Sequence, residues 1–532
     1  MTATLTHIES KIPILQNDSS CPPVTQPSVF SCVRLCAFSI PLPCGPIMLE
    51  TEAISSIENL NPATQESLGR VAFSTPSEIE HAVQTAHKTY HFWKELPPQR
   101  RARIFLRYQA LITAHLEELA RGIVDEQGKT FDDAKGDVMR GLEVVEYAAS
   151  IPSLIMGETV ENVASGMDTY SFQQPLGVCA GITPFNFPAM VPLWMFPLAL
   201  ACGNTFVLKP SEQCPRTPAR LVELAYEAGL PEGALQLIQG GKEAVESLCD
   251  HPLIRAISFV GSTQVGRAVH ERGTRQGKRV QALLGAKNHA VIMPDADRER
   301  SLNAVVGAAF GASGQRCMAV SVAVLVGEAA AWVDELVVKA RGLKVGSGHG
   351  EVDLGPLISK QAVERVESLI QSAEEAGAEL LLDGRSCVVP GYERGNFIGP
   401  TIVTAVDPSM AIYREELFGP VLCVLTVDTL DEALDLIQRN PYGNGASIFT
   451  ESGGHARRFQ HCVDAGQVGI NVPIPVPLPF FSFTGWGDSI RGDLHAYGKH
   501  GVRFYTRTKT VTSRYFSEET FSNTLSTSMR NL

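Results

Sequence analysis

What the sequence has little of excludes several classes of protein. Its 532 residues contain 45 Lys and Arg against 57 Asp and Glu, a net charge of −12, so it lacks the basic character that nucleic-acid-binding proteins need. No hydrophobic run reaches the roughly 18–20 residues that cross a membrane. The nearest candidate, residues 189–202, is shorter and is interrupted by Pro192 and Pro197. We therefore expect no nucleic-acid partner and no membrane association.

The cysteines lack the pattern of a disulfide-bonded or zinc-binding protein. There are 12 of them, and none belongs to a CxxC pair. Cys32 and Cys36 are closest together, but no histidine or second cysteine pair completes a metal site around them. We expect reduced thiols and no bound metal.

The first 50 residues differ from the rest of the chain. They lack the basic start and apolar stretch of a secretory signal, and they lack the arginine-rich, acid-poor composition of a mitochondrial transit peptide. We interpret residues 1–50 as an atypical, disordered leader. With no readable targeting signal, a cytoplasmic location is expected rather than the mitochondrial matrix.

From about residue 53 onward, short apolar runs alternate with helical patterns. Thr75, Pro76 and Glu78 are typical of a helix N-terminus, with an N-cap, a proline in the first turn and a capping glutamate. The alternation predicts a parallel α/β sheet with crossover helices. Strands are expected at residues 177–183, 205–209, 256–260 and 289–293, and helices at residues 99–127, 131–149, 217–228, 244–249, 362–376 and 430–439.

Two segments could bind a dinucleotide. Residues 259–266 lead from a strand directly into a helix, and such a turn offers free N–H groups to a phosphate. Lys209 ends another strand, at the edge where open parallel sheets bind ligands. Strand–glycine–helix turns and solvated lysines are both common, so these segments alone leave an ordinary structural role open.

Cys317 differs in context from the other cysteines. It follows the small residues of 311–314, which let a substrate approach the backbone, and Arg316 beside it favours a thiolate. A thiol nucleophile also needs a donor for the developing oxyanion. Asn186, between aromatic residues and prolines, is the candidate. A buried structural cysteine and an asparagine in a turn are the alternatives.

Five short motifs, in this order, resemble the aldehyde dehydrogenase superfamily. The resemblance covers about residues 61–514. It implies an α/β fold with a Rossmann-like cofactor domain, an α/β catalytic domain and a small β oligomerisation element. The motifs are PFNFP (184–188), LKPSE (208–212), FVGSTQVG (259–266), GQRC (314–317) and EELFGP (415–420).

The resemblance also implies domain boundaries and an oligomer. The strands of the oligomerisation element would extend a partner's sheet, so a homodimer or homotetramer is expected. The N-terminal hairpin motif of the family is not found before Asn61, which leaves the edge of the first domain in doubt. The implied boundaries are 51–152 and 175–285 for the NAD-binding domain, 286–480 for the catalytic domain, and 153–174 with 502–514 for the oligomerisation strands.

By this resemblance, Cys317 is the nucleophile, and Asn186 with the Cys317 backbone amide forms the oxyanion hole. NAD is the implied cofactor, although NADP is not excluded. Lys209 and Glu212 would hold the adenosine ribose, and Glu416 the nicotinamide ribose. The implied cofactor-binding residues are Thr183, Phe185, Lys209, Glu212, Gly261, Ser262, Gly266, Glu416 and Phe418.

One departure from the family is informative. Hydrolytic members carry a glutamate that activates water against the thioester, and Leu283 stands at that position here. Leucine cannot act as a general base, so the acyl group needs another acceptor, and coenzyme A is the obvious one. Three alternatives stay open: another carboxylate that activates water, a hydrolytic enzyme of unusual specificity, and a catalytically silent NAD-binding relative.

Two arginines indicate an anionic substrate. Arg316 adjoins the nucleophile and Arg140 lies on an expected helix along the substrate channel; guanidinium groups suit carboxylate recognition. With the segments 285–289 and 504–514, they are similar to the branch of the family that acts on methylmalonate and malonate semialdehydes in valine catabolism. The expected reaction is oxidation by NAD with decarboxylation, giving propionyl-CoA or acetyl-CoA.

Overall fold

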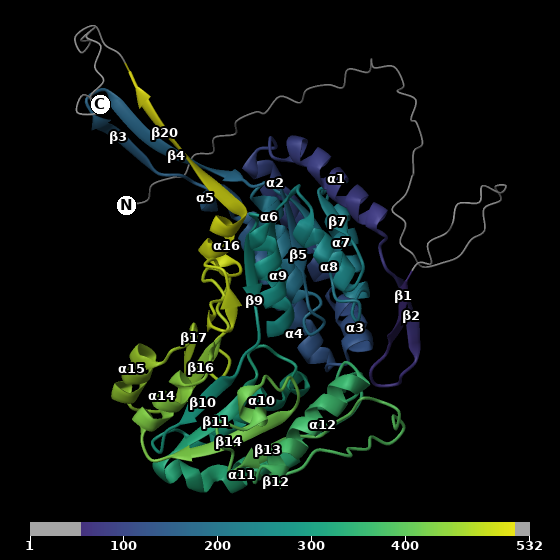
Figure 1. Cartoon of the computed structure of the whole chain (residues 1–532), viewed down its shortest axis with the longest axis vertical. Coiled ribbons are helices and arrows are strands. Elements are labelled where there is room, and N and C mark those ends of the chain that lie inside the picture. The colour runs from purple at the N-terminus through teal and green to yellow at the C-terminus, as the bar shows by residue number, and fades with distance from the viewer. Residues whose placement is uncertain (1–54, 516–532) are drawn as a thin grey trace, which may run out of the picture. The chain divides into compact units, whose positions relative to one another are not determined.

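The computed structural model describes residues 55–515, so the leader predicted at residues 1–50 lies outside the described part. Two large sheets and one small sheet organise this part of the chain (Figure 1). These sheets with the helices between their strands form an α/β fold, as the sequence predicted. We propose the domain boundaries given above as its division, and the separation into these sheets supports them.

The first large sheet has six strands in the order β19-β9-β8-β5-β6-β7. Its strands are parallel except β19, which is antiparallel to β9. The strands are β5 (Val178–Ile182), β6 (Thr205–Lys209), β7 (Leu235–Leu237), β8 (Ile254–Val260), β9 (Arg279–Leu283) and β19 (Ile490–Arg491). The helices along this part of the chain are α1 (Pro76–Trp93), α2 (Pro98–Ala114), α3 (Leu116–Gln127), α4 (Phe131–Ala149), α5 (Ile151–Leu154), α6 (Met190–Ala201), α7 (Arg216–Glu227), α8 (Lys242–Asp250) and α9 (Thr263–Arg275).

The second large sheet has seven strands in the order β12-β13-β14-β11-β10-β16-β17. Only the β12–β13 pair is antiparallel. The strands are β10 (Asn288–Ile292), β11 (Val320–Val326), β12 (Glu379–Leu382), β13 (Thr401–Thr404), β14 (Val421–Val427), β16 (Gly445–Phe449) and β17 (Gln467–Ile470). The helices along it are α10 (Arg298–Phe310), η1 (Gly311–Gly314), η2 (Gly327–Trp332), α11 (Val333–Arg341), α12 (Lys360–Glu375), α13 (Ala411–Arg414), α14 (Leu430–Gln438) and α15 (Gly453–Cys462).

The small sheet joins segments far apart in sequence. Strand β20 pairs antiparallel with β4, which pairs with β3, and Figure 1 shows this sheet reaching away from the large ones. Helix α16 (Gly498–Tyr505) leads directly into β20. The remaining strands form two antiparallel pairs, β1 with β2 and β15 with β18. The bounds are β1 (Ser56–Leu60), β2 (Ser67–Ala72), β3 (Thr159–Ala164), β4 (Met167–Pro175), β15 (Tyr442–Gly443), β18 (Trp486–Gly487) and β20 (Thr506–Arg514).

Several expected elements are confirmed. Thr75 and Glu78 form a capping box at the start of α1, and α4 spans the residues expected for it. The helix expected over 99–127 is two helices, because the chain breaks at His115 between α2 and α3. Strand β1 forms a hairpin with β2 although the expected motif was missing, since backbone pairing does not require those side chains.

The apolar run at residues 189–202 forms α6, a helix of the core. All of its residues are buried although it contains Pro197. A helix that is apolar on every side belongs inside a protein, and α6 packs closely against α4. Its position matters for function because α6 begins directly after the segment that carries Asn186.

The carboxyl ends of the parallel strands in the first sheet carry the candidate residues. Thr183 and Asn186 follow β5, Glu212 follows β6, Gly261 follows β8, and Leu283 ends β9. This is the edge at which open parallel sheets bind ligands. Residues 284–287 then cross to β10 and the second sheet.

Candidate active site

A tight turn before β11 presents Cys317. Ala312 and Ser313 have positive φ angles of 50° and 54°, a conformation that non-glycine residues rarely adopt. Gly314 also has a positive φ, and a Cβ added there would lie 2.1 Å from the carbonyl oxygen of Gly419. Only glycine therefore fits where the turn meets the segment that follows Glu416.

Two asparagine amides hold the main chain of the nucleophile. Asn288 Nδ2 donates to the carbonyl oxygens of Cys317 and Ala319, each at 2.9 Å, and Asn444 Nδ2 donates to the Cys317 carbonyl at 2.9 Å. Neither asparagine was predicted from the sequence to have a functional role. Asn288 lies in the segment 285–289 that contributed to the resemblance, but no signal in the sequence pointed to Asn444.

Asn186 lies beside the Cys317 turn, as expected of a residue that would act with it. Its side chain is buried, and Nδ2 donates to the carbonyl oxygen of Gln315 at 2.9 Å. An asparagine amide has a second N–H. This N–H is the group that could donate to the oxyanion formed on a carbonyl that the Cys317 thiol attacks.

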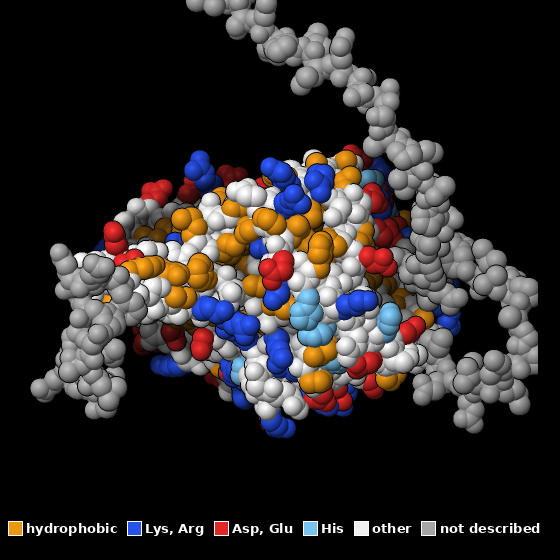
Figure 2. All heavy atoms as spheres, turned by 90° about the horizontal axis from the view of Figure 1, so that it is seen from above, with side chains coloured by type: hydrophobic (Ala, Val, Ile, Leu, Met, Phe, Trp, Pro, Cys, Tyr) orange, Lys and Arg blue, Asp and Glu red, His pale blue; other side chains and the backbone are white. Residues whose placement is uncertain are grey.

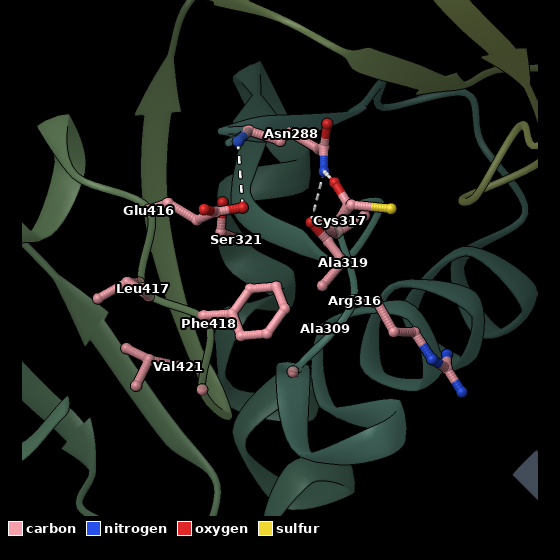
Figure 3. A pocket seen from close by; sticks show the side chains of 14 residues that line it. Asn288, Ala309, Arg316, Cys317, Ala319, Ser321, Glu416, Leu417, Phe418 and Val421 are labelled. Atoms are coloured by element: carbon pink, nitrogen blue, oxygen red, sulfur yellow. Dashed lines mark hydrogen bonds between the residues drawn. The ribbon is translucent and has the colours of Figure 1, made fainter. Parts of the chain in front are cut away.

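The surroundings of Cys317 oppose ionisation of its thiol. Burial raises the pKa of Cys317 to about 12, and the Glu416 carboxylate adds to the increase. Arg316 acts in the opposite direction but has less effect than burial. Its guanidinium is paired with Asp133, and Figure 3 shows the Arg316 side chain running away from the sulfur. The expectation that Arg316 favours a thiolate is correct in direction only.

Leu283 is buried and apolar, at the position where the resemblance puts an acid in hydrolytic enzymes. It is 5% exposed and belongs to a large core cluster that includes Met318. Cys317 packs against this cluster. Its chain neighbours Ala282 and Leu284 pack in a different cluster, on the other side of β9. The side chain at position 283 therefore lies on the side of the strand that the Cys317 cluster occupies.

The expected adenosine side of the cofactor site is assembled at β6 and β8. Lys209 Nζ and Glu212 Oε2 are 3.1 Å apart. Ser262 is the N-cap residue of α9, and its side chain makes no capping hydrogen bond. A Cβ added to Gly266 would lie 2.1 Å from Leu284 Cδ2, so glycine lets α9 pack closely against the end of β9.

The expected nicotinamide side is built around Glu416. Glu416 Oε1 accepts a hydrogen bond from the Ala286 N–H at 3.1 Å, and burial raises the pKa of this carboxyl to about 7. A Cβ added to Gly285 would lie 2.8 Å from Glu416 Oε2. Phe418 extends toward the Cys317 turn (Figure 3), and its ring meets that of Phe185 edge to face at 5.8 Å between centroids.

Arg140 lies on α4 and is partly exposed. Its Nη1 donates to Glu143 Oε2 at 2.9 Å. Burial raises the pKa of Tyr497, and the charges of Arg140 and Cys317 act on it in opposite directions. Arg140 and Cys317 therefore both lie within electrostatic range of the same buried tyrosine, although no direct contact between the two is observed.

Two further observations concern the described part of the chain. Residues 55–515 contain no group of three or more His, Cys, Asp or Glu side chains arranged to hold a metal ion. Among the same residues, no helix combines the length and the apolar character that crossing a membrane requires.

Two enzymes are similar to this chain over most of its length. An enzyme from Bos taurus named methylmalonate-semialdehyde/malonate-semialdehyde dehydrogenase [acylating], mitochondrial, is 56% identical over 472 residues, which cover 88% of this chain and 88% of the relative. The Homo sapiens enzyme of the same name is 54% identical over 476 residues, covering 89% of each chain. Both names include the mitochondrion, so the expected cytoplasmic location is wrong: an atypical leader did not exclude that compartment.

Solved structures agree with these relatives. The methylmalonate-semialdehyde dehydrogenase from Oceanimonas doudoroffii is 48% identical with a TM-score of 0.87, and the match covers 88% of this chain and 97% of that one. A relative from Sinorhizobium meliloti 1021, provisionally named for the same activity and solved complexed with NAD, is 48% identical with a TM-score of 0.86, covering 88% and 96%. The family model for the aldehyde dehydrogenase family matches residues 48–511. The chain therefore belongs to the aldehyde dehydrogenase family.

Proposed function

We propose that this protein is an NAD-dependent, CoA-acylating dehydrogenase of methylmalonate semialdehyde and malonate semialdehyde. The observation that carries the proposal is Leu283, an apolar and buried residue where hydrolytic deacylation would need a base. The acyl-enzyme then passes its acyl group to coenzyme A instead of water. The acylating relatives at 54–56% identity support this activity.

The proposed roles follow the geometry of the turn. Cys317 attacks the aldehyde carbon, and the Asn186 amide with the Cys317 backbone N–H stabilises the oxyanion. Asn288 and Asn444 hold the carbonyl of Cys317 and so fix the peptide that carries the nucleophile. Loss of hydride leaves a thioester on Cys317, whose carbonyl can accept the electrons released when the substrate carboxylate leaves as CO₂. The resulting enolate takes up a proton, which gives the propionyl or acetyl thioester that coenzyme A then accepts.

The residues present fit a nicotinamide dinucleotide, which supplies the hydride acceptor when bound. Thr183 Oγ1 is buried and has no hydrogen-bond partner within residues 55–515, so it is available to a ligand. Lys209 and Glu212 would hold the adenosine ribose, and Gly261, Ser262 and Gly266 the pyrophosphate at the start of α9. Glu416 would bind the nicotinamide ribose while Phe185 and Phe418 border the ring.

We propose Arg140 and Arg316 as the residues that recognise the substrate carboxylate. Both guanidinium groups are at present paired with acids, Glu143 and Asp133. A substrate carboxylate would therefore either share the arginines with these acids or displace the acids. This requirement restricts binding to anionic aldehydes of suitable length.

A homodimer or homotetramer formed through the small sheet is part of the proposal. The strand β17 lies at the edge of the seven-stranded sheet, beside a groove of about 430 Å³ that includes Val468 and Phe481. Strand β20 is an edge strand as well, and Val160, Val163 and Phe172 are exposed on β3 and β4. On the face seen in Figure 2, hydrophobic side chains gather in patches among charges of both signs. Such edges and patches are typical of surfaces that a partner covers.

The names of the relatives support two further proposals. The Bos taurus and Homo sapiens enzymes are named mitochondrial, so we place this protein in mitochondria. Their names also give methylmalonate and malonate semialdehyde as substrates, and from the resemblance we propose valine catabolism as the setting of the reaction. Fractionation of cells that make the full chain tests the location: recovery in the cytosolic fraction alone would contradict it.

One assay tests the reaction. NADH formation is measured with each semialdehyde, with and without coenzyme A, and the acyl product is identified by mass. The expected result is propionyl-CoA from methylmalonate semialdehyde and acetyl-CoA from malonate semialdehyde, with a single turnover when coenzyme A is absent. Sustained release of free propionate without coenzyme A would establish the hydrolytic alternative. A Cys317→Ala variant that keeps the biological role would establish the silent alternative.

A further inference from the structure

A buried ion pair lies directly behind the Asn186 segment. Lys129 Nζ and Asp137 Oδ2 are 3.2 Å apart, and the two side chains are 1% and 0% exposed. Neither residue belongs to the catalytic, cofactor or substrate sites described above. Burying two charges is costly and is tolerated only with further hydrogen bonds, so the remaining contacts of the pair indicate what it holds.

These contacts hold the segment that runs from Asn186 to the start of α6. Lys129 Nζ donates to the carbonyl oxygen of Asn186 at 2.6 Å and lies 4.1 Å from the centroid of the Phe187 ring. Asp137 Oδ1 accepts from the Met190 N–H, the first residue of α6, at 2.7 Å. The pair therefore binds the main chain at both ends of the stretch that joins Asn186 to its helix.

The turn that carries Cys317 is anchored to a residue that packs on the main chain of the same segment, at Gly128 and Lys129. Ser313 Oγ donates to the carbonyl oxygen of Gly355 at 2.6 Å, and a Cβ added to Gly355 would lie 1.9 Å from the carbonyl oxygen of Gly128. Likewise, a Cβ on Gly348 would lie 2.1 Å from the carbonyl oxygen of Lys129. The residues that anchor the Cys317 turn are thus packed on the backbone of Lys129, whose ammonium anchors Asn186.

We propose that Lys129 and Asp137 are positioning residues that hold the Asn186 amide against the Cys317 turn. This inference rests on the proposed function, because it takes Asn186 as the oxyanion donor. An oxyanion donor is effective only when it is fixed before the reaction, and a displacement of about 1 Å can reduce the rate roughly 100-fold. The ion pair provides that fixation without touching the substrate.

The test removes the charges and keeps the shape. In the variant Lys129→Met/Asp137→Asn no unpaired charge stays buried, and the asparagine oxygen can still accept from the Met190 N–H. Asp137→Asn alone is a second variant, which leaves the Lys129 ammonium buried without its acid. The matched control is Lys278→Met, which removes another buried lysine. Its Nζ donates to the carbonyl oxygens of His251, on the loop before β8, and Ile254, the first residue of β8.

Three measurements separate positioning from general damage. The first is the rate of the NADH burst in a single turnover with methylmalonate semialdehyde, without coenzyme A. The second is the rate at which iodoacetamide alkylates Cys317, a reaction that forms no oxyanion. The third is the burst rate of each variant combined with Asn186→Ala, since residues that act through Asn186 lose their effect when it is absent.

The expected result is a burst about 100-fold slower in Lys129→Met/Asp137→Asn, with little change in alkylation, and no further loss when Asn186→Ala is added. A loss in the same direction is expected for Asp137→Asn, and none for Lys278→Met. Losses that multiply with that of Asn186→Ala, or a parallel loss of alkylation, would overturn the inference. A wild-type protein that gives no burst would instead contradict the proposed function, which distinguishes the two failures.

Discussion

The most direct test of the acylating chemistry is to restore the missing base with Leu283→Glu. Leu283 is 5% exposed and shares a core cluster with the residues around Cys317. Replacing it puts a carboxyl group into apolar surroundings, and we expect a loss of about 3 kcal/mol of unfolding free energy from the lost leucine and the buried acid. In exchange, a general base contributes roughly 10²–10⁴-fold to proton transfer, so the thioester should become open to hydrolysis.

The assay is steady-state NADH formation from methylmalonate semialdehyde without coenzyme A. The wild type should stop after one turnover, whereas Leu283→Glu should continue at a rate at least about 100-fold above the wild-type background. Burial should raise the pKa of the new carboxyl, as it raises the pKa of the nearby Glu416 to about 7. Only the ionised form is a base, so the coenzyme-A-free rate should increase with pH through that raised pKa and then level off.

Leu283→Gln is the matched control, since glutamine has nearly the shape of glutamate and is also polar but has no basic carboxylate. If Leu283→Glu and Leu283→Gln give the same burst and both then stop, a missing base is not what prevents hydrolysis, and the reasoning from Leu283 is refuted. Denaturant unfolding of both variants shows whether the loss of stability stays within the expected range.

Three further outcomes are expected. Because burial raises the pKa of Cys317 to about 12, its alkylation by iodoacetamide in the ligand-free protein should increase about tenfold for each pH unit from 7 to 10; a plateau below pH 9 would contradict this. Because the pKa of Glu416 is raised to about 7, the fraction of ionised carboxylate, which accepts the ribose hydroxyls, increases with pH. The Kd for NAD should therefore decrease from pH 6 to pH 8, and Glu416→Gln should remove that pH dependence in a binding titration. Gly285→Ala would place a Cβ 2.7 Å from Thr263 Oγ1 and 2.8 Å from Glu416 Oε2, so we expect NAD affinity at least about tenfold weaker in a binding titration. The control is Gly377→Ala, which has open space around it but a positive φ that strains alanine, and it should affect only stability.

The sequence was sufficient for those parts of the fold that depend on local signals. The capping residues Thr75 and Glu78 start α1 as expected, and β6 spans the expected residues. The break at His115 was missed, because the apolar periodicity continues through it while the chain changes direction. Helix α6 was missed for a related reason: a helix buried on every side has no polar face, so its sequence shows no helical period.

The candidate site could be predicted where a motif carries the chemistry and not where tertiary packing does. Cys317 and Asn186 stand in recognisable motifs, and the structure brings Asn186 within 2.9 Å of the Cys317 turn. The pairing of Arg316 with Asp133 joins residues 183 positions apart, and no local pattern indicates it. For the same reason the sequence suggested a thiolate at Cys317, whereas burial, which depends on the whole fold, favours the thiol.

The residues that sequence reasoning missed have a common function in the structure. Asn186, Cys317 and Glu416 lie in loops, outside the helices and strands. A buried main-chain carbonyl without a partner is unfavourable. Side-chain donors fill these positions: Asn288 and Asn444 for Cys317, Lys129 for Asn186, and Lys287, whose Nζ donates to the carbonyl of Glu415 at 2.7 Å, beside Glu416. The donors bind the main chain beside each functional side chain, so they leave that side chain free to react while fixing where it stands. Substitution of a donor should therefore reduce the rate through misplacement of the reacting group, whereas substitution of Cys317 itself removes the chemistry.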